Sequence, residues 1–250
     1  MESEKPFGGR QLRGAEKTMA TLRGYYRFSG WLLLLSGLIT IVIQYIHLED
    51  VPADLNQMGY FVDAAVWTHI GLLLSFAMFL MGFVGLYLRQ AAQLKWWGWL
   101  SFGCLFLFVV LDLLHAPIQI FSYPVLFAGV ETEEQLQIAS ELVMRIGAEG
   151  PGTFLMMLLM PLVLVGTILM GIAMLKAGVL PKGPAIATLV SVVLIVLPYG
   201  PVTKYVFPLQ YAVYVWYGAV LAFERTRVQE ANVPTTGAGG QSGETTSVQN

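Results

Sequence analysis

Charged residues are scarce in this 250-residue chain, and long stretches contain none. Asp, Glu, Lys and Arg together make up 12% of the sequence, whereas hydrophobic residues make up 56%. Soluble domains carry roughly 25% charged residues, because charge covers their surface. The net charge of −2 offers no basic surface for nucleic acid, so we expect no nucleic-acid partner. This shortage excludes an ordinary soluble domain and indicates a membrane protein.

Several groups that carry chemistry in other proteins are also missing. The single cysteine, Cys104, lies inside an apolar run, so an intramolecular disulfide is impossible. The sequence has no phosphate-binding glycine loop, no GxSxG, no CxxC and no HExxH. No lysine stands in the middle of an apolar run. A non-enzymatic membrane protein is therefore favoured over an ATP-driven or nucleophilic enzyme.

The sequence does contain apolar runs suited to crossing a membrane. About 20 apolar residues cover roughly 30 Å of hydrocarbon. We predict an all-α, polytopic membrane bundle of six transmembrane helices, with spans at residues 28–46, 65–88, 96–116, 154–175, 184–197 and 203–223. Residues 1–27 form a basic cytoplasmic tail. Residues 225–250, which are rich in Gly, Thr and Ser, form a disordered cytoplasmic tail.

The basic residues support this count and place both chain ends in the cytoplasm. With six crossings, 12 of the 14 Lys and Arg residues lie inside, and only Arg145 and Lys204 lie outside. The positive-inside rule predicts this distribution. Removing the short fifth span would move Arg225 and Arg227 outside. The expected location is the cytoplasmic membrane of a bacterium, with membrane lipid as a partner, and the acidic outer loops either attract cations or are simply solvated.

The second outer loop contains the signature of a short helix. Residues 132–135, Thr-Glu-Glu-Gln, fit a capping box with Thr132 as N-cap. Leu136, Ala139, Val143 and Ile146 follow at spacings of three and four. The pattern predicts an amphipathic helix over residues 133–146, on the outer membrane surface or over the mouth of the bundle.

Asp112 is the only acidic residue inside a predicted span, and His115 follows it by about one helical turn. An ionisable residue within a membrane is a candidate for function. The two side chains either form a proton-exchanging or metal-binding pair, or satisfy one another near the end of the helix. Pro117 disfavours helical geometry at Ala116, so the helix is expected to bend or end there.

The other two histidines occupy a similar depth. His47 ends the first predicted span and His69 opens the second. Three imidazoles and the Asp112 carboxylate would suit a tetrahedral zinc or similar divalent metal. Haem between facing histidines is a further alternative, although His69 and His115 are expected to lie too close together for its two axial positions. The structural alternative is three separate interfacial histidines and no cofactor.

Polar residues form stripes along two other spans, at Ser36, Thr40, Gln44 and His47 and at Gln210, Tyr214 and Tyr217. Polar side chains that face lipid have no hydrogen-bond partner, so these stripes should face the interior of the bundle. They indicate either an outward-facing polar pocket or ordinary hydrogen bonding between helices. The pocket would be lined by Gln44, His47, His69, Asp112, His115, Gln210 and Tyr214. Small residues at Gly82, Gly85, Gly166 and Gly171 are predicted to allow close helix packing.

Three functional hypotheses follow. The leading one is a small bundle that binds or passes a small solute or cation through the polar pocket, or assists a partner membrane protein. The second is a membrane-embedded enzyme that uses a metal or other cofactor at the His/Asp cluster. The third is a purely structural or assembly subunit.

Overall fold

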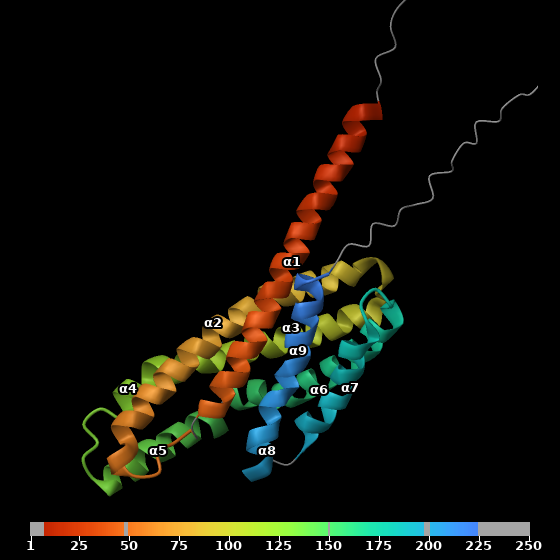
Figure 1. Ribbon diagram of the computed structural model, residues 1–250. Coiled ribbons are helices and arrows are strands. Elements are labelled where there is room, and N and C mark those ends of the chain that lie inside the picture. The colour runs from red at the N-terminus through yellow and green to blue at the C-terminus, as the bar shows by residue number, and fades with distance from the viewer. Residues whose placement is uncertain (1–7, 48–49, 150, 198–200, 225–250) are drawn as a thin grey trace, which may run out of the picture.

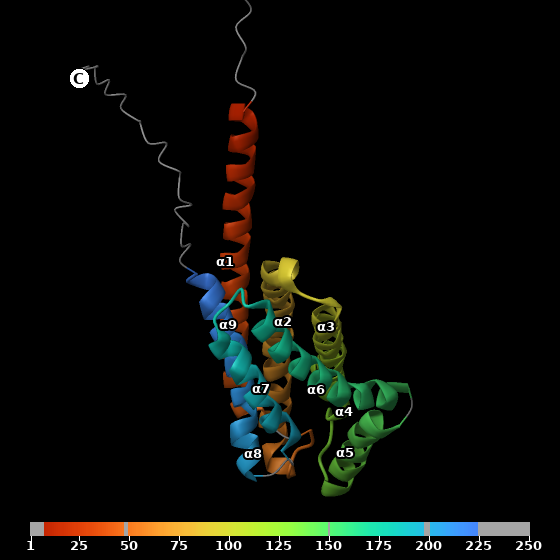
Figure 2. The same ribbon diagram turned by 90° about the vertical axis from the view of Figure 1, so that its right-hand side faces the viewer.

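Four long helices form most of the described part of the molecule, and they pack side by side (Figures 1 and 2). The computed structural model describes residues 8–47, 50–149, 151–197 and 201–224, and all regular structure within these ranges is helical. The long helices are α1 (Gly8–Ile46), α2 (Met58–Gln90), α3 (Trp96–Pro117) and α6 (Pro151–Ala177). Shorter ones are α4 (Tyr123–Leu126), α5 (Glu133–Ala148), α7 (Lys182–Val196), α8 (Pro201–Val206) and α9 (Ala212–Ala222). The prediction of an all-α fold is confirmed.

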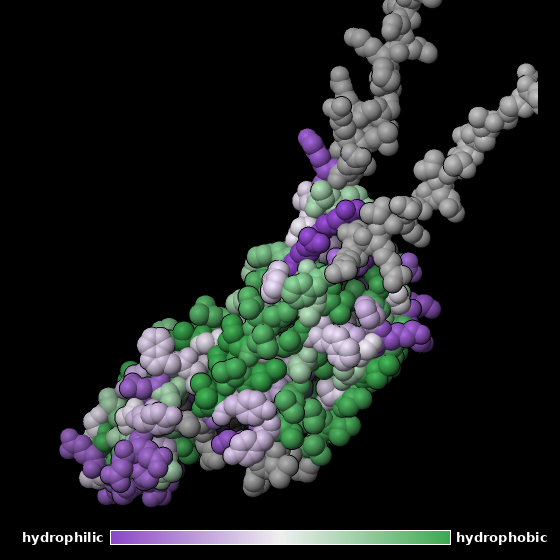
Figure 3. Space-filling view, in the orientation of Figure 1, coloured by the Kyte–Doolittle hydropathy of each residue, from purple (hydrophilic) through white to green (hydrophobic). Residues whose placement is uncertain are grey.

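Within the described ranges, four helical segments are long and apolar enough to cross a membrane. They are Lys17–Ile46, Leu55–Gln93, Trp96–Leu126 and Thr153–Ala177. A shorter apolar helix covers Lys182–Val196. Large apolar side chains are exposed on these segments, such as Trp67, Met157 and Val190. Figure 3 shows a hydrophobic middle with hydrophilic residues towards both ends. These features suggest a multi-pass membrane protein; six spans and the orientation stay predictions.

Helix α1 packs between α2 and α9, while α6 packs between α3 and α7. Glycines make these approaches close. A Cβ atom built on Gly82 would lie 2.7 Å from the backbone oxygen of Ser29, and one on Gly218 would lie 2.7 Å from that of Gly30. Carbonyl oxygens of a neighbouring helix cannot move aside as a flexible side chain can. The predicted close-packing role is confirmed at Gly82, and also at the remaining predicted glycines Gly85, Gly166 and Gly171.

Helix boundaries differ from the sequence prediction in several places, and α2, for example, begins at Met58 rather than at residue 65. Helix α1 begins at Gly8, well inside the predicted tail. Helix α3 ends at Pro117, one residue beyond the predicted end, where the backbone passes into a π-helical turn, Ile118–Ser122, and then into α4. The wider π turn accommodates a proline that has no N–H to donate. The last predicted span is interrupted, because the 3₁₀ segment Phe207–Tyr211 separates α8 from α9. The predicted tail at 225–250 lies outside the described residues.

The predicted loop helix is present as α5, and its capping box is confirmed. The Thr132 hydroxyl accepts a hydrogen bond from the Gln135 backbone N–H, and the Gln135 side chain accepts one from the Thr132 N–H. The helix ends at Ala148, two residues beyond the predicted end. Leu136 and Ala139 are buried in a cluster with residues of α2 and α4. Helix α5 therefore packs against one end of the bundle.

Candidate functional site

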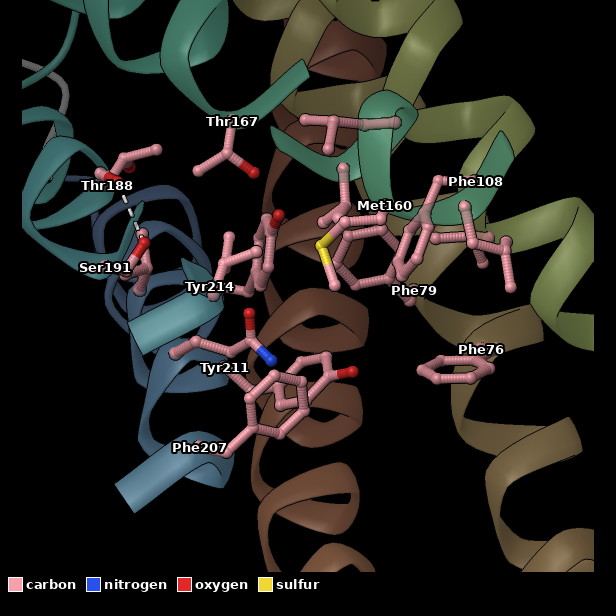
Figure 4. A pocket seen from close by; sticks show the side chains of 17 residues that line it. Phe76, Phe79, Phe108, Met160, Thr167, Thr188, Ser191, Phe207, Tyr211 and Tyr214 are labelled. Carbon is pink, nitrogen blue, oxygen red and sulfur yellow. Dashed lines mark hydrogen bonds between the residues drawn. The ribbon is translucent and has the colours of Figure 1, made fainter. Parts of the chain in front are cut away.

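A cavity of about 120 Å³ lies inside the bundle, between α2, α3, α6, α7 and the segment from Phe207 into α9 (Figure 4). Its wall is mostly apolar and aromatic. The lining residues are Phe76, Phe79, Leu105, Phe108, Val109, Leu159, Met160, Val163, Thr167, Thr188, Ser191, Ile195, Phe207, Gln210, Tyr211, Val213 and Tyr214. Below it is called the central cavity.

The polar and aromatic sides of the central cavity face one another. Thr167, Thr188 and Ser191 stand on one side, across from the rings of Phe76, Phe79 and Phe108 (Figure 4). Two of these hydroxyls are already used within α7. Thr188 donates to the carbonyl of Pro184 at 2.8 Å, and Ser191 donates to the carbonyl of Thr188 at 2.8 Å. These hydroxyls need no ligand to satisfy them.

Three other polar side chains that line the cavity come from one short segment. The 3₁₀ turn that carries Pro208 brings Gln210, Tyr211 and Tyr214 to the cavity wall. Gln210 is only 8% exposed. Over the described ranges, neither the Gln210 amide nor the Tyr211 and Tyr214 hydroxyls make a hydrogen bond to another residue. Buried polar groups such as the Gln210 amide are normally satisfied, and the two tyrosines are half-buried. The cavity therefore presents an amide and two phenols to an occupant.

The cavity has a rim on the side of α6. Met160 lines the cavity and is nevertheless 54% exposed, so it belongs to both the interior and the outer surface. It lies beside Pro161, within the apolar segment Thr153–Ala177. A neighbouring surface groove between α7 and α9 shares Ser191 and Val213 with the central cavity. Access therefore lies along faces of the molecule that are apolar.

Asp112 stands next to this cavity without lining it. It follows Val109, a lining residue, by about one turn of α3 and is half-buried. Its carboxyl group is close enough to the Tyr211 phenol for the two to interact electrostatically. The predicted partner of Asp112, His115, has a backbone in α3, but its side chain lies outside the described residues. The Asp112–His115 pair stays a prediction.

The histidines at the ends of the first two predicted spans do converge. The Nε2 atoms of His47 and His69 lie 3.2 Å apart, and the two ring centroids are separated by 4.9 Å. His47 follows the last residue of α1, while His69 lies in α2 and is 3% exposed. The antiparallel packing of α1 on α2 brings these residues to the same level.

The backbone determines which nitrogen of His69 carries a proton. Nδ1 of His69 lies 2.8 Å from the carbonyl oxygen of Ala65, which can only accept, so Nδ1 must donate. In the neutral ring, Nε2 then has its lone pair directed at His47. Metal-binding histidines commonly donate their other ring N–H to a backbone carbonyl in the same way. Two ring nitrogens on a tetrahedral zinc at 2.0–2.1 Å would lie about 3.3–3.4 Å apart, close to the observed spacing.

The predicted four-residue metal centre is assembled only in part. Among the described residues, no group of three or more His, Cys, Asp and Glu side chains is placed to hold a metal ion, so Asp112 does not complete such a group with His47 and His69. The contribution of His115 lies outside the described side chains. Zinc coordinated by all four residues, and haem, therefore stay predictions.

The first polar stripe faces inward, as predicted, and much of it forms inter-helix hydrogen bonds. Ser36 and Thr40 are buried. The Thr40 and Ser75 hydroxyls lie 2.7 Å apart, and Ser75 donates to the Ser36 carbonyl at 2.8 Å. Gln44 is half-buried and does not line the central cavity. For Ser36 and Thr40, the helix-packing interpretation is the right one.

Of the seven residues predicted to line a pocket, Gln210 and Tyr214 line the central cavity. Sequence reasoning missed the phenylalanines that line the cavity, namely Phe76, Phe79 and Phe108 on the opposite wall and Phe207 near Tyr211 (Figure 4). Their spacing in apolar helices is that of ordinary core residues, so nothing in the sequence distinguishes them. Gln210 and Tyr214 could be identified from the sequence because they are polar residues in an apolar span.

The fold and the cavity suggest a helical membrane protein, and they indicate no particular activity. Comparisons of the chain with protein-family models, with curated proteins and with solved structures find no match.

Proposed function

We propose that this protein binds a small, mainly apolar molecule with one hydrogen-bonding end, which it takes up from the membrane into the central cavity. The observation that carries the proposal is a polar group in an otherwise apolar and aromatic cavity: the buried amide of Gln210 and the half-buried phenols of Tyr211 and Tyr214. The aromatic wall would contact the apolar part of the ligand. The amide and the phenols would bind its polar end.

The size of the cavity limits the ligand. An apolar cavity of about 150 Å³ accommodates benzene, so a volume of 120 Å³ suits one ring or a short length of alkyl chain. A larger molecule would extend past Met160 into the surrounding lipid. The exposed apolar surface beside the rim favours entry from the bilayer over entry from water.

The ligand-binding role is favoured over catalysis by the groups available. Among the lining residues, the titratable side chains are the phenols of Tyr211 and Tyr214. Asp112 lies at the edge, where it interacts with Tyr211. These groups are sufficient for a binding or carrier protein, or for an accessory subunit of a partner membrane protein.

Binding of 4-fluorophenol, followed by ¹⁹F NMR on the protein in lipid nanodiscs, tests the proposal. The key variant is Val163→Phe, because Val163 lines the cavity and the larger phenyl side chain would fill it. The matched control is Val165→Phe on the same helix, where the side chain is 44% exposed. We expect the first change to abolish specific binding and the second to leave it intact. Equal binding by both variants would overturn the proposal.

The polar end is tested separately with Gln210→Leu, an apolar residue of similar size. This variant should bind 4-fluorotoluene at least as well as the unchanged protein, while its affinity for 4-fluorophenol falls by about tenfold, the loss of one buried hydrogen bond. An unchanged preference for the phenol would show that Gln210 does not bind the ligand.

A second candidate function is metal binding, which the His47–His69 geometry favours. The 3.2 Å spacing of the Nε2 atoms and the Ala65 contact are those of two imidazoles that share a divalent ion, with water in the open positions. Co²⁺ titration followed by visible absorption tests it. A tetrahedral Co²⁺ spectrum that disappears in both His47→Ala and His69→Ala supports a metal site. Absence of that spectrum in the unchanged protein assigns the pair to a histidine–histidine hydrogen bond.

A further inference from the structure

A second cavity, of about 320 Å³, lies at the end of the bundle where α1 continues beyond its neighbours (Figure 1). It is lined by Met19, Leu22, Arg23, Tyr26, Arg27, Arg89, Leu221 and Glu224. Arg89 is 13 positions from Phe76 along α2, about 20 Å away along the helix axis. This second cavity, called the basic cavity below, is therefore separate from the central cavity.

One face of α1 forms most of the basic cavity. Met19, Leu22, Arg23, Tyr26 and Arg27 recur at spacings of three and one, which places them on a single helical stripe. Opposite them lie Arg89 near the end of α2, Leu221 of α9, and Glu224. Apolar side chains and charged groups thus line the same cavity.

Arg89 is fixed in place within this surface. The Arg89 guanidinium donates hydrogen bonds to both carboxylate oxygens of Glu224, at 2.6 and 3.2 Å. Its central carbon, Cζ, lies 5.9 Å from the centre of the Tyr26 ring. Arg23 and Arg27 are exposed. In the described part of the chain, neither of them forms an ion pair. Three guanidinium groups and one carboxylate leave a charge of +2 on the cavity wall.

The position of the cavity along α1 indicates which anion it suits. The uncharged stretch of α1 starts at Phe28, directly after Arg27. If α1 crosses the membrane through that stretch, the cavity lies at headgroup depth. Basic pockets between helices at such a level bind anionic lipid headgroups. Met19, Leu22 and Leu221 would contact the glycerol and the upper acyl chains.

We propose that the basic cavity binds the phosphate group of an anionic phospholipid of the surrounding bilayer, held by Arg23 and Arg27 with Arg89 behind them. The planar guanidinium groups match phosphate oxygens through paired hydrogen bonds. This site is independent of the central cavity and of the ligand proposed for it.

Native mass spectrometry of the full chain in detergent tests the site, with phosphatidylglycerol and phosphatidylcholine of identical acyl chains as probes. The double variant R23Q/R27Q removes two cavity charges. The matched control, K95Q/K182Q, removes two charges from exposed positions outside the cavity. Because each basic group near an anionic lipid contributes roughly a fivefold factor, we expect R23Q/R27Q to weaken phosphatidylglycerol binding by about thirtyfold. K95Q/K182Q should bind as the unchanged protein does.

Equal losses in the two double variants would overturn the proposal, since they would reflect overall charge. Unchanged binding in R23Q/R27Q would also overturn it. Displacement of phosphatidylglycerol by millimolar inorganic phosphate would assign the cavity to a free anion. The variant R23K/R27K keeps the charge but cannot form the paired hydrogen bonds, so its affinity should lie between those of the unchanged protein and R23Q/R27Q. A circular dichroism spectrum should confirm that every variant is helical, which separates a binding defect from misfolding.

Discussion

The imidazole rings of His47 and His69 approach to 3.2 Å between their Nε2 atoms, although the two residues lie 22 positions apart. One ring follows the end of α1 and the other is buried in α2. The Ala65 carbonyl accepts a hydrogen bond from Nδ1–H of His69 and so orients its ring. The pair is therefore held by the backbone of α2 as well as by helix packing.

This geometry predicts the tautomer of each ring in the metal-free, neutral pair. His69 should carry its proton on Nδ1, and His47 should carry one on Nε2, which it donates to His69. Two-dimensional ¹⁵N–¹H NMR of histidine-labelled protein distinguishes the two tautomers, with His69→Gln and His47→Gln for assignment. A neutral His69 with its proton on Nε2 would contradict the predicted donation from Nδ1–H to the Ala65 carbonyl.

Close packing of α1 on α9 predicts a large effect at Gly218. A Cβ there would lie 2.7 Å from the Gly30 carbonyl, so Gly218→Ala should force the helices apart and lower the free energy of unfolding by about 1–3 kcal/mol. Gly103→Ala is the control, because a Cβ there meets no atom within 4 Å. Thermal unfolding in detergent should show a lower midpoint for the first variant and an equal or higher one for the second.

The hydroxyl bridge between α1 and α2 predicts a non-additive pair of substitutions. Ser75→Ala removes both its contact with Thr40 and its bond to the Ser36 carbonyl, which should cost about 0.6–1.7 kcal/mol inside a membrane. Thr40→Val in the same background removes the remaining unsatisfied hydroxyl, so the double variant should be no less stable than Ser75→Ala. Chemical unfolding of all four proteins measures this cycle. Strict additivity would show that the hydroxyls are not coupled.

The capping box predicts a local effect on α5. Thr132→Ala removes the acceptor for the Gln135 N–H and should destabilise the start of the helix by about 1 kcal/mol, whereas Thr132→Ser retains it. Amide hydrogen exchange over the first turn of Glu133–Ala148 should accelerate in the alanine variant alone. Faster exchange throughout α2 as well would indicate that α5 stabilises the whole end of the bundle through Leu136 and Ala139.

Much of the fold could be predicted from local patterns, and the failures have identifiable causes. The capping box at Thr132 was recognisable because it needs only neighbouring residues. The π turn after Pro117 could not be predicted, because a proline in the sequence shows only which backbone hydrogen bond is lost. It does not show how the backbone adjusts to that loss. The break around Pro208 in the last predicted span has the same origin.

The candidate site divides in a similar way. Gln210 and Tyr214 could be found because polar side chains in an apolar helix should face inward. Phe76, Phe79 and Phe108 could not, because an aromatic residue that lines a cavity has the same helical spacing as one in a packed core. Whether the rings leave a space between them depends on helices that are far apart in the chain.

The sequence by itself determined that the chain is helical and suited to a membrane, because hydrocarbon excludes charge and requires backbone hydrogen bonds within each segment. It also placed His47 at the end of the first helix, whereas His69, predicted near the start of the second, lies well inside α2. The tertiary structure alone decided that His47 meets His69, that Gln210 and the tyrosines face a cavity, and that three arginines line a second cavity. Those distances depend on how the helices pack, and packing is set by side-chain volumes and by glycine contacts such as Gly30 with Gly218.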